Sequence, residues 1–248
     1  MQHHSMDRSE RPPVPARRER PRAAAAARGL VSELFQSDLP AKEREHLAET
    51  FAAAFGGAAF SPLLLDKLQS GDEDERVIAA LALGARGNCD VVPALIAALE
   101  DAAERVRRAA ARALGEIAAP EAADALLAAL AERPGRALEL EIVSSLRRVE
   151  HPRGEEALVL ALAHEEVEVQ LMALAGLRHR PCAGSLPEAR RLLSAEDARV
   201  RAMAVAVLER AGDPEDLDAL APLLGDADVR VRALARDAAF ALERRAAR

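Results

Sequence analysis

Apolar residues recur along this chain with a period of 31 or 32 residues, beginning near Glu75. In each unit they fall at relative positions zero, four, seven and eight, as in Val106, Ala110, Ala113 and Leu114. This spacing places them on one face of an α-helix. No segment alternates between apolar and polar residues with period two, so we expect no β-strands. A second apolar stripe follows a turn in each unit and starts near a proline, which the first helical turn tolerates: Pro93, Pro120, Pro152, Pro187 and Pro214.

A unit of two short helices cannot bury its apolar face alone, so neighbouring units must stack and share a continuous core. The pattern therefore predicts an all-α fold, a right-handed α-solenoid of about seven stacked helix pairs. We assign residues 71–248 to the repeats and residues 29–70 to atypical N-terminal capping helices. Residues 1–28 form a basic tail rich in Pro, Arg and Ala, for which we predict disorder because it has no periodic apolar face.

Within the capping segment, Gly56 and Gly57 end one expected helix, and Ser61 and Pro62 open the next as its N-cap and first helical residue. Four of the five phenylalanines lie in this region, and the chain contains no Trp or Tyr. We interpret the phenylalanines as the core of the cap, because a terminal repeat has one face without a neighbour.

Three segments carry a shared motif: residues 197–204 (Asp-Ala-Arg-Val-Arg-Ala-Met-Ala), residues 228–235 (Asp-Val-Arg-Val-Arg-Ala-Leu-Ala) and residues 106–115, which run from Val-Arg to Ala-Leu-Gly. They resemble the short HEAT-like repeats named after phycobilin lyases, and the resemblance covers roughly residues 70–245. In that family a Val-Arg pair follows an acidic turn. This chain departs from the pattern at Glu139 and Gln170, where arginine is expected. The resemblance implies the fold and leaves the function open.

The arginine of the Val-Arg pair recurs in one stacked row that we expect to form a structural ladder of ion pairs between repeats. An anion-binding row is the alternative. The expected carboxylate partners are Asp101, Asp197 and Asp228, and the ladder arginines are Arg76, Arg107, Arg201 and Arg232.

Charge limits the possible partners. The formal net charge is −7, and residues 29–248 alone carry 27 basic and 38 acidic side chains. Such an acidic solenoid repels phosphate on average, so we expect no nucleic acid bound to it. No apolar run is long enough for a membrane span and no signal sequence is present, which favours a cytoplasmic location. The two cysteines, Cys89 and Cys182, lie about three repeats apart, too far for a disulfide.

Motifs for catalysis are missing from the sequence. Only His164-Glu165 matches the His-Glu pairs that hold iron in HEAT-like hydroxylases, and one pair cannot form a dinuclear site. We therefore expect no catalytic residues, no metal and no cofactor, and a protein that is not an enzyme.

Acidic residues are concentrated in the two units that lack the ladder arginine. Between Glu132 and Glu168 nine glutamates face five arginines. A solvated helix face would explain this excess, and an acidic patch that binds a basic segment of a protein partner is the sharper interpretation. We expect a non-enzymatic protein-protein interaction scaffold that binds its partner through the concave or acidic surface of the repeats. The alternatives are a phycobilin lyase or isomerase-type subunit and a binding role for the basic tail. The candidate partner-binding residues are Glu139, Glu141, Glu165, Glu166 and Glu168.

Overall fold

The computed structural model describes residues 61–85, 87–132, 134–182 and 184–247, together with Pro40, Glu43 and His46. The tail of residues 1–28 and most of the capping segment lie outside the described residues. Every regular element in the described part is helical, as the apolar pattern predicts. In chain order the elements are α3 (Ser61–Ser70), α4 (Glu73–Gly84), η1 (Cys89–Val91), α5 (Val92–Ala97), η2 (Ala98–Glu100), α6 (Glu104–Ile117), α7 (Glu121–Ala131), α8 (Arg136–Leu146), α9 (Pro152–Ala161), α10 (Val167–His179), α11 (Ser185–Leu192), α12 (Ala198–Ala211), η3 (Pro214–Asp216), α13 (Leu217–Leu220), η4 (Ala221–Gly225) and α14 (Val229–Ala246).

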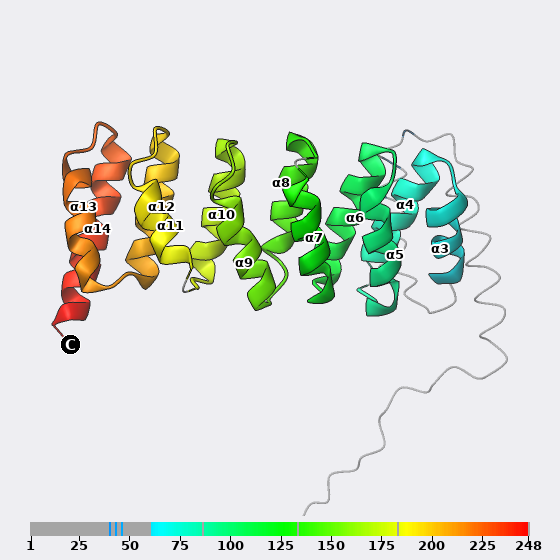
Figure 1. The fold of residues 1–248 in the computed structure, drawn as a ribbon, viewed down its shortest axis with the longest axis horizontal. Coiled ribbons are helices and arrows are strands. Elements are labelled where there is room, and N and C mark those ends of the chain that lie inside the picture. The colour runs from blue at the N-terminus through cyan, green and yellow to red at the C-terminus, as the bar shows by residue number, and fades with distance from the viewer. Residues whose placement is uncertain are drawn as a thin grey trace, which may run out of the picture.

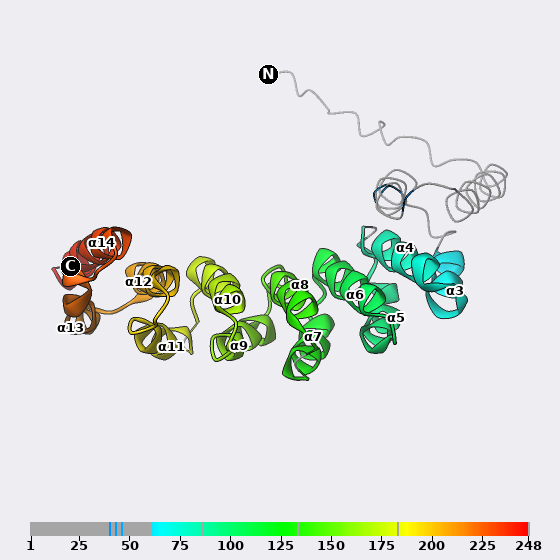
Figure 2. The same cartoon turned by 90° about the horizontal axis from the view of Figure 1, so that it is seen from above.

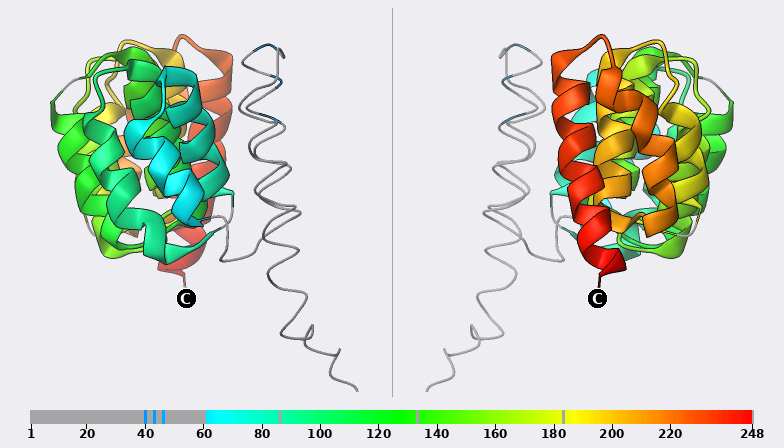
Figure 3. Two further views of the ribbon diagram at one scale, coloured as in Figure 1. Left: turned by 90° about the vertical axis from the view of Figure 1, so that its right-hand side faces the viewer. Right: turned by 90° about the vertical axis from the view of Figure 1, so that its left-hand side faces the viewer.

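The helices stack side by side in two rows, which confirms the all-α solenoid (Figure 1). We call α4, α6, α8, α10, α12 and α14 the first helices, and α5, α7, α9, α11 and α13 the second helices. Figure 2 shows the two rows from above, curved gently so that the first helices lie on the concave side. Seen along the stack from either end, successive helices lie behind one another (Figure 3). The exposed surface of the first-helix row is called the inner face below.

Side-chain caps fix where the first helices begin. Asp72 and Glu75 form a capping box at the start of α4. The side chains of Asp197 and Asp228 accept hydrogen bonds from the backbone N–H groups that open α12 and α14. These bonds satisfy amides that have no partner inside the helix. Pro93, Pro152 and Pro214 occupy the first turns of second-helix segments, as predicted. Ser61 differs from its expected role, because it is the first residue of α3 and its Oγ is buried without a hydrogen-bond partner.

The core lies between the rows and continues through all repeats. Val106, Ala110, Ala113 and Leu114 are all buried, which confirms the predicted stripe. Consecutive first helices pack so closely that small residues are required where they touch. A Cβ added to Gly84 would lie 2.5 Å from the Cα of Ala113 in the next first helix. Alanine and glycine occupy these contacts because larger side chains there would force the layers apart.

No helix in the described part of the chain combines the length and the apolarity needed to cross a bilayer.

Replacing Leu114 by alanine tests the shared core. Leu114 is fully buried, so Leu114→Ala should lower the free energy of unfolding by about 2–5 kcal/mol. Leu160 is 60% exposed and serves as the control, since Leu160→Ala removes the same atoms from the surface. Denaturant unfolding followed by circular dichroism measures both. Equal stabilities of the two variants would contradict the proposed packing.

Candidate functional site

The ladder begins with a pair of arginines that share one aspartate. Arg76 donates two hydrogen bonds to the carboxylate of Asp101 in the following turn, at 2.8 and 3.0 Å. The same carboxylate accepts a bond from the backbone N–H of Ala103. Arg107, one repeat later, donates to the backbone carbonyls of Asp101 and Ala102. We call each such contact between an arginine and the next turn a rung. It joins the first helix of one repeat to the turn and first helix of the next.

The same arrangement recurs at the other end of the solenoid. Arg201 forms two 2.8 Å hydrogen bonds with the carboxylate of Asp226, and Arg232 donates to the Asp226 carbonyl. Asp226 also accepts from the backbone N–H of Asp228. The hydrogen bonds from Arg201 and from that backbone group lower the pKa of Asp226 below its ordinary value.

The expected acidic partners of this ladder need correction at two positions. Asp197 and Asp228 do not accept from the ladder arginines. They cap α12 and α14 by accepting from the backbone N–H groups of Arg199 and Arg230. The rung is instead made by Asp226, two residues before Asp228, because that residue faces the preceding repeat.

At the centre of the solenoid the acidic residue of the rung and its partner exchange positions. Glu139 occupies the arginine position, and His164 occupies the aspartate position. The His164 Nε2 lies 3.3 Å from Glu139 Oε2, although it makes no aligned hydrogen bond. His164 Nδ1 accepts from the Glu166 N–H, as the aspartates do at their own turns. Gln170 donates to the His164 carbonyl, which replaces the bond of a ladder arginine.

This geometry corrects the prediction that Glu139 binds a partner. Glu139 is only 5% exposed, because the ladder position points into the contact between repeats. A carboxylate there ends inside the interface and faces His164. It is unavailable to a partner that approaches from solvent.

Three of the other four predicted glutamates, Glu165, Glu166 and Glu168, lie at the N-terminal end of α10, and Glu165 is exposed. Glu141 is half-buried in the middle of α8, at the position that Met172 occupies in α10. Glu166 and Glu168 approach Arg136, at 3.9 and 3.2 Å. This surface keeps an excess of carboxylates, which Arg136 neutralises in part. We call Glu165, Glu166 and Glu168 the acidic edge.

The middle of the inner face is apolar. Two adjacent positions of the first helices are partly exposed there. The first carries Leu140 and Leu171, with Ala202 in α12. The second carries Met172, Met203 and Leu234, with Glu141 in α8. Ala175 lies about one turn further along α10 and is also partly exposed.

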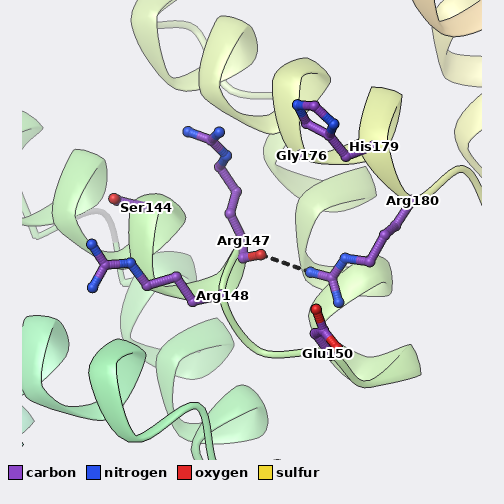
Figure 4. Close-up of a pocket in the computed structure, with 7 residues that line it drawn as sticks. All are labelled: Ser144, Arg147, Arg148, Glu150, Gly176, His179 and Arg180. Carbon is purple, nitrogen blue, oxygen red and sulfur yellow. Dashed lines mark hydrogen bonds between the residues drawn. The ribbon is translucent and has the colours of Figure 1, made fainter.

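Arginines gather at the C-terminal ends of the same helices, around a pocket of about 420 Å³ between α8 and α10. In Figure 4 the Arg147 side chain extends toward α10, and Arg148 points to the other side. The Arg147 stem packs over Gly176, where an added Cβ would lie 2.8 Å from Arg147 Cγ. Arg180 donates to the Arg147 and Val149 carbonyls and so caps the end of α8. The lining residues are Ser144, Arg147, Arg148, Glu150, Gly176, His179 and Arg180.

A second pocket of about 290 Å³ lies two repeats further along the same edge. Arg210 in this pocket corresponds to Arg148 in the first, 62 residues earlier. Arg245 donates to carbonyls at the end of α12, as Arg180 does for α8. The lining residues are Arg178, Ala206, Glu209, Arg210, Ala241 and Arg245.

The sequence interpretation missed these arginines, although a signal was present. Arg147 and Arg178 occupy the position held by Gly84 and Gly115 in the preceding repeats. A register comparison of the Ala-Leu-Gly motif would have found them.

Among the described residues no group of three or more His, Cys, Asp or Glu is arranged to hold a metal ion. Cys89 and Cys182 are both free thiols.

The sequence and the fold are both similar to those of known HEAT repeat proteins. The sequence profile of HEAT repeats matches residues 61–147 and 155–239. No curated protein matches the chain. The fold is similar to an archaeal HEAT-like repeats protein from Thermococcus onnurineus, with 17% identity over 84% of this chain and 98% of that one and a TM-score of 0.56. An engineered protein shares 22% identity over 88% of this chain and 68% of its own, with a TM-score of 0.55. The complex of CpcE and CpcF of phycocyanin lyase from Nostoc shares 21% identity over 97% of this chain and 100% of that one, with a TM-score of 0.49.

Replacing Glu139 and His164 by the arginine and aspartate of the other rungs tests whether the central contact is a reversed copy of its neighbours. Glu139→Arg alone places a guanidinium against His164 and should destabilise the protein, because it removes one member of a buried pair. His164→Asp alone brings two carboxylates together. The double variant rebuilds the Arg–Asp rung, so a double-mutant cycle should give a coupling free energy of about 1–3 kcal/mol in favour of the pair. Additive effects in denaturant unfolding would show that the two residues do not form a rung.

Proposed function

The chain belongs to the HEAT repeat family, and we propose that it is a non-enzymatic scaffold or adaptor that binds a protein partner across its inner face. One observation carries this proposal. The inner face combines partly exposed apolar side chains in its middle with charged side chains at both edges, in repeat register. Protein interfaces have this composition, with an apolar centre and a polar rim.

The acidic edge supports a finer proposal, which is that the partner presents a basic segment to it. Glu165 is exposed, and the side chains of Glu166 and Glu168 are 44% and 39% exposed. Charges at such a rim act mainly on the rate of encounter, because they steer an oppositely charged partner. The edge therefore contributes orientation, and the apolar middle contributes most of the contact area.

The likeness to the phycocyanin lyase complex concerns the repeat fold and does not transfer an activity to this chain. The scaffold proposal rests on the inner face itself.

A bulky side chain in the middle of the inner face should block the partner. Ala175 is suitable, because the equivalent positions carry Arg112 and Asp237, so the fold accepts a long side chain there. Proteins recovered from native lysate on the immobilised wild type define the partner. Ala175→Arg should reduce its recovery about tenfold. The matched control is Leu160→Arg on the second helix α9, which should retain the partner. Equal recovery by both variants would contradict binding at the inner face.

Charge reversal at the acidic edge tests the basic segment. Glu165→Lys with Glu166→Lys should slow association with the recovered partner and flatten its salt dependence, with little effect on folding. Stopped-flow association across a salt series measures both properties. An unchanged rate and slope would remove the acidic edge from the binding surface.

A further inference from the structure

We propose that the two arginine-lined pockets at the C-terminal ends of the first helices bind the carboxylates of an acidic segment of the partner protein. This inference rests on the proposed scaffold function and names the chemistry that the second edge of the inner face recognises. The pockets lie between α8 and α10 and beside α12 and α14.

A comparison of equivalent positions in the repeats shows that the packing of α8 against α10 leaves room for the Arg147 side chain. In earlier layers the close contact is made by a glycine on the preceding helix, as Gly115 does against Ser145. At the α8–α10 contact the arrangement is reversed. Arg147 takes the glycine position, and Gly176 takes the position of Ser145 on the following helix. The small residue at this contact is therefore Gly176, and the aliphatic part of the Arg147 side chain packs against it.

Two arginines of the first pocket keep donors that the described residues do not bind. Arg147 Nε makes no hydrogen bond in the described part of the chain, so no carboxylate of the protein holds this group. Arg148 makes a 3.9 Å contact with Glu116 and leaves most of its donors to solvent. Arg180 uses its guanidinium to cap α8, so it supplies fixed positive charge next to the free donors. Arginine is suited to carboxylates because its planar donors match two oxygens at once.

The spacing of the pockets defines the length of the ligand. They are two repeats apart, which corresponds to roughly 20 Å at the usual distance between packed helices. An extended chain spans this distance with roughly six residues. One acidic segment lying along the edge can therefore place carboxylates in both pockets, and each pocket raises the effective concentration at the other.

Charge complementarity favours an acidic protein segment over a nucleic acid. Glu150 and Glu209 line the two pockets, and the acidic edge lies at the N-terminal end of α10. The phosphate backbone of a nucleic acid is repelled by these carboxylates. In an extended peptide alternate side chains point away from the surface, so some of its carboxylates can meet the arginines while the others stay in solvent.

Binding of fluorescein-labelled deca-glutamate to the full chain, measured by anisotropy at low ionic strength, tests the inference. Wild type should bind saturably. Arg147→Ser with Arg148→Ser, and separately Arg178→Ser with Arg210→Ser, should each weaken binding about fivefold or more. The matched control is Arg230→Ser with Arg236→Ser, two exposed arginines of α14 outside the pockets. It removes the same charge and should change the affinity within about twofold.

Gly176→Ala distinguishes a built pocket from diffuse positive charge. It keeps every arginine, but the added Cβ would lie 2.8 Å from both Arg147 Cγ and Leu158 Cδ1, so it displaces the Arg147 stem and should weaken binding about threefold or more. Circular dichroism at the assay temperature checks that each variant is folded, and Gly176→Ala should unfold at a lower temperature than wild type because it also presses on the buried Leu158.

Equal affinities of pocket and control variants, or unchanged binding by Gly176→Ala, would overturn the inference. Tighter binding of a ten-nucleotide oligothymidylate, lost in the same variants, would overturn the assignment to a protein segment. If wild type does not bind deca-glutamate while Ala175→Arg still loses the partner, this inference fails and the scaffold function stands.

Discussion

The close approach of consecutive first helices is the constraint on which the rest of the structure depends. No repeat buries its apolar stripe alone, so each first helix must come near enough to the next to share a core. One side of each contact must then carry a very small residue, as Gly84 does against Ala113. The charged features of the inner face are arranged around these contacts.

The turns between repeats add a second requirement, because their carbonyl and amide groups need partners away from bulk water. The ladder arginines meet it at the two ends, where Arg76 and Arg201 also bind a carboxylate of the next turn. At the centre, Gln170 keeps the carbonyl contact, and the acidic residue, Glu139, stands on the side that carries arginine elsewhere and faces His164. The same backbone geometry is thus served by different side chains.

The sequence was sufficient to predict the repeat fold and the apolar stripe, because both follow from spacing alone. The pattern could not decide between Asp226 and Asp228, since two acids two residues apart differ only in the direction that the turn gives them. Nor could it show that Glu139 is buried, because a glutamate among glutamates looks like a solvated face. The arginine pockets were visible only as a loss of glycine at Arg147 and Arg178, whose meaning depends on the compensating Gly176.

Photo-crosslinking from single positions tests most directly the claim that the inner face is the binding surface. Benzoylphenylalanine would replace Ala202, in α12 on the inner face, or Leu160, which is exposed on the second helix α9. In cells that express the protein, we expect the Ala202 position to form a discrete adduct with a partner and the Leu160 position to form none. Adducts from Leu160 alone, or from both positions equally, would contradict the account.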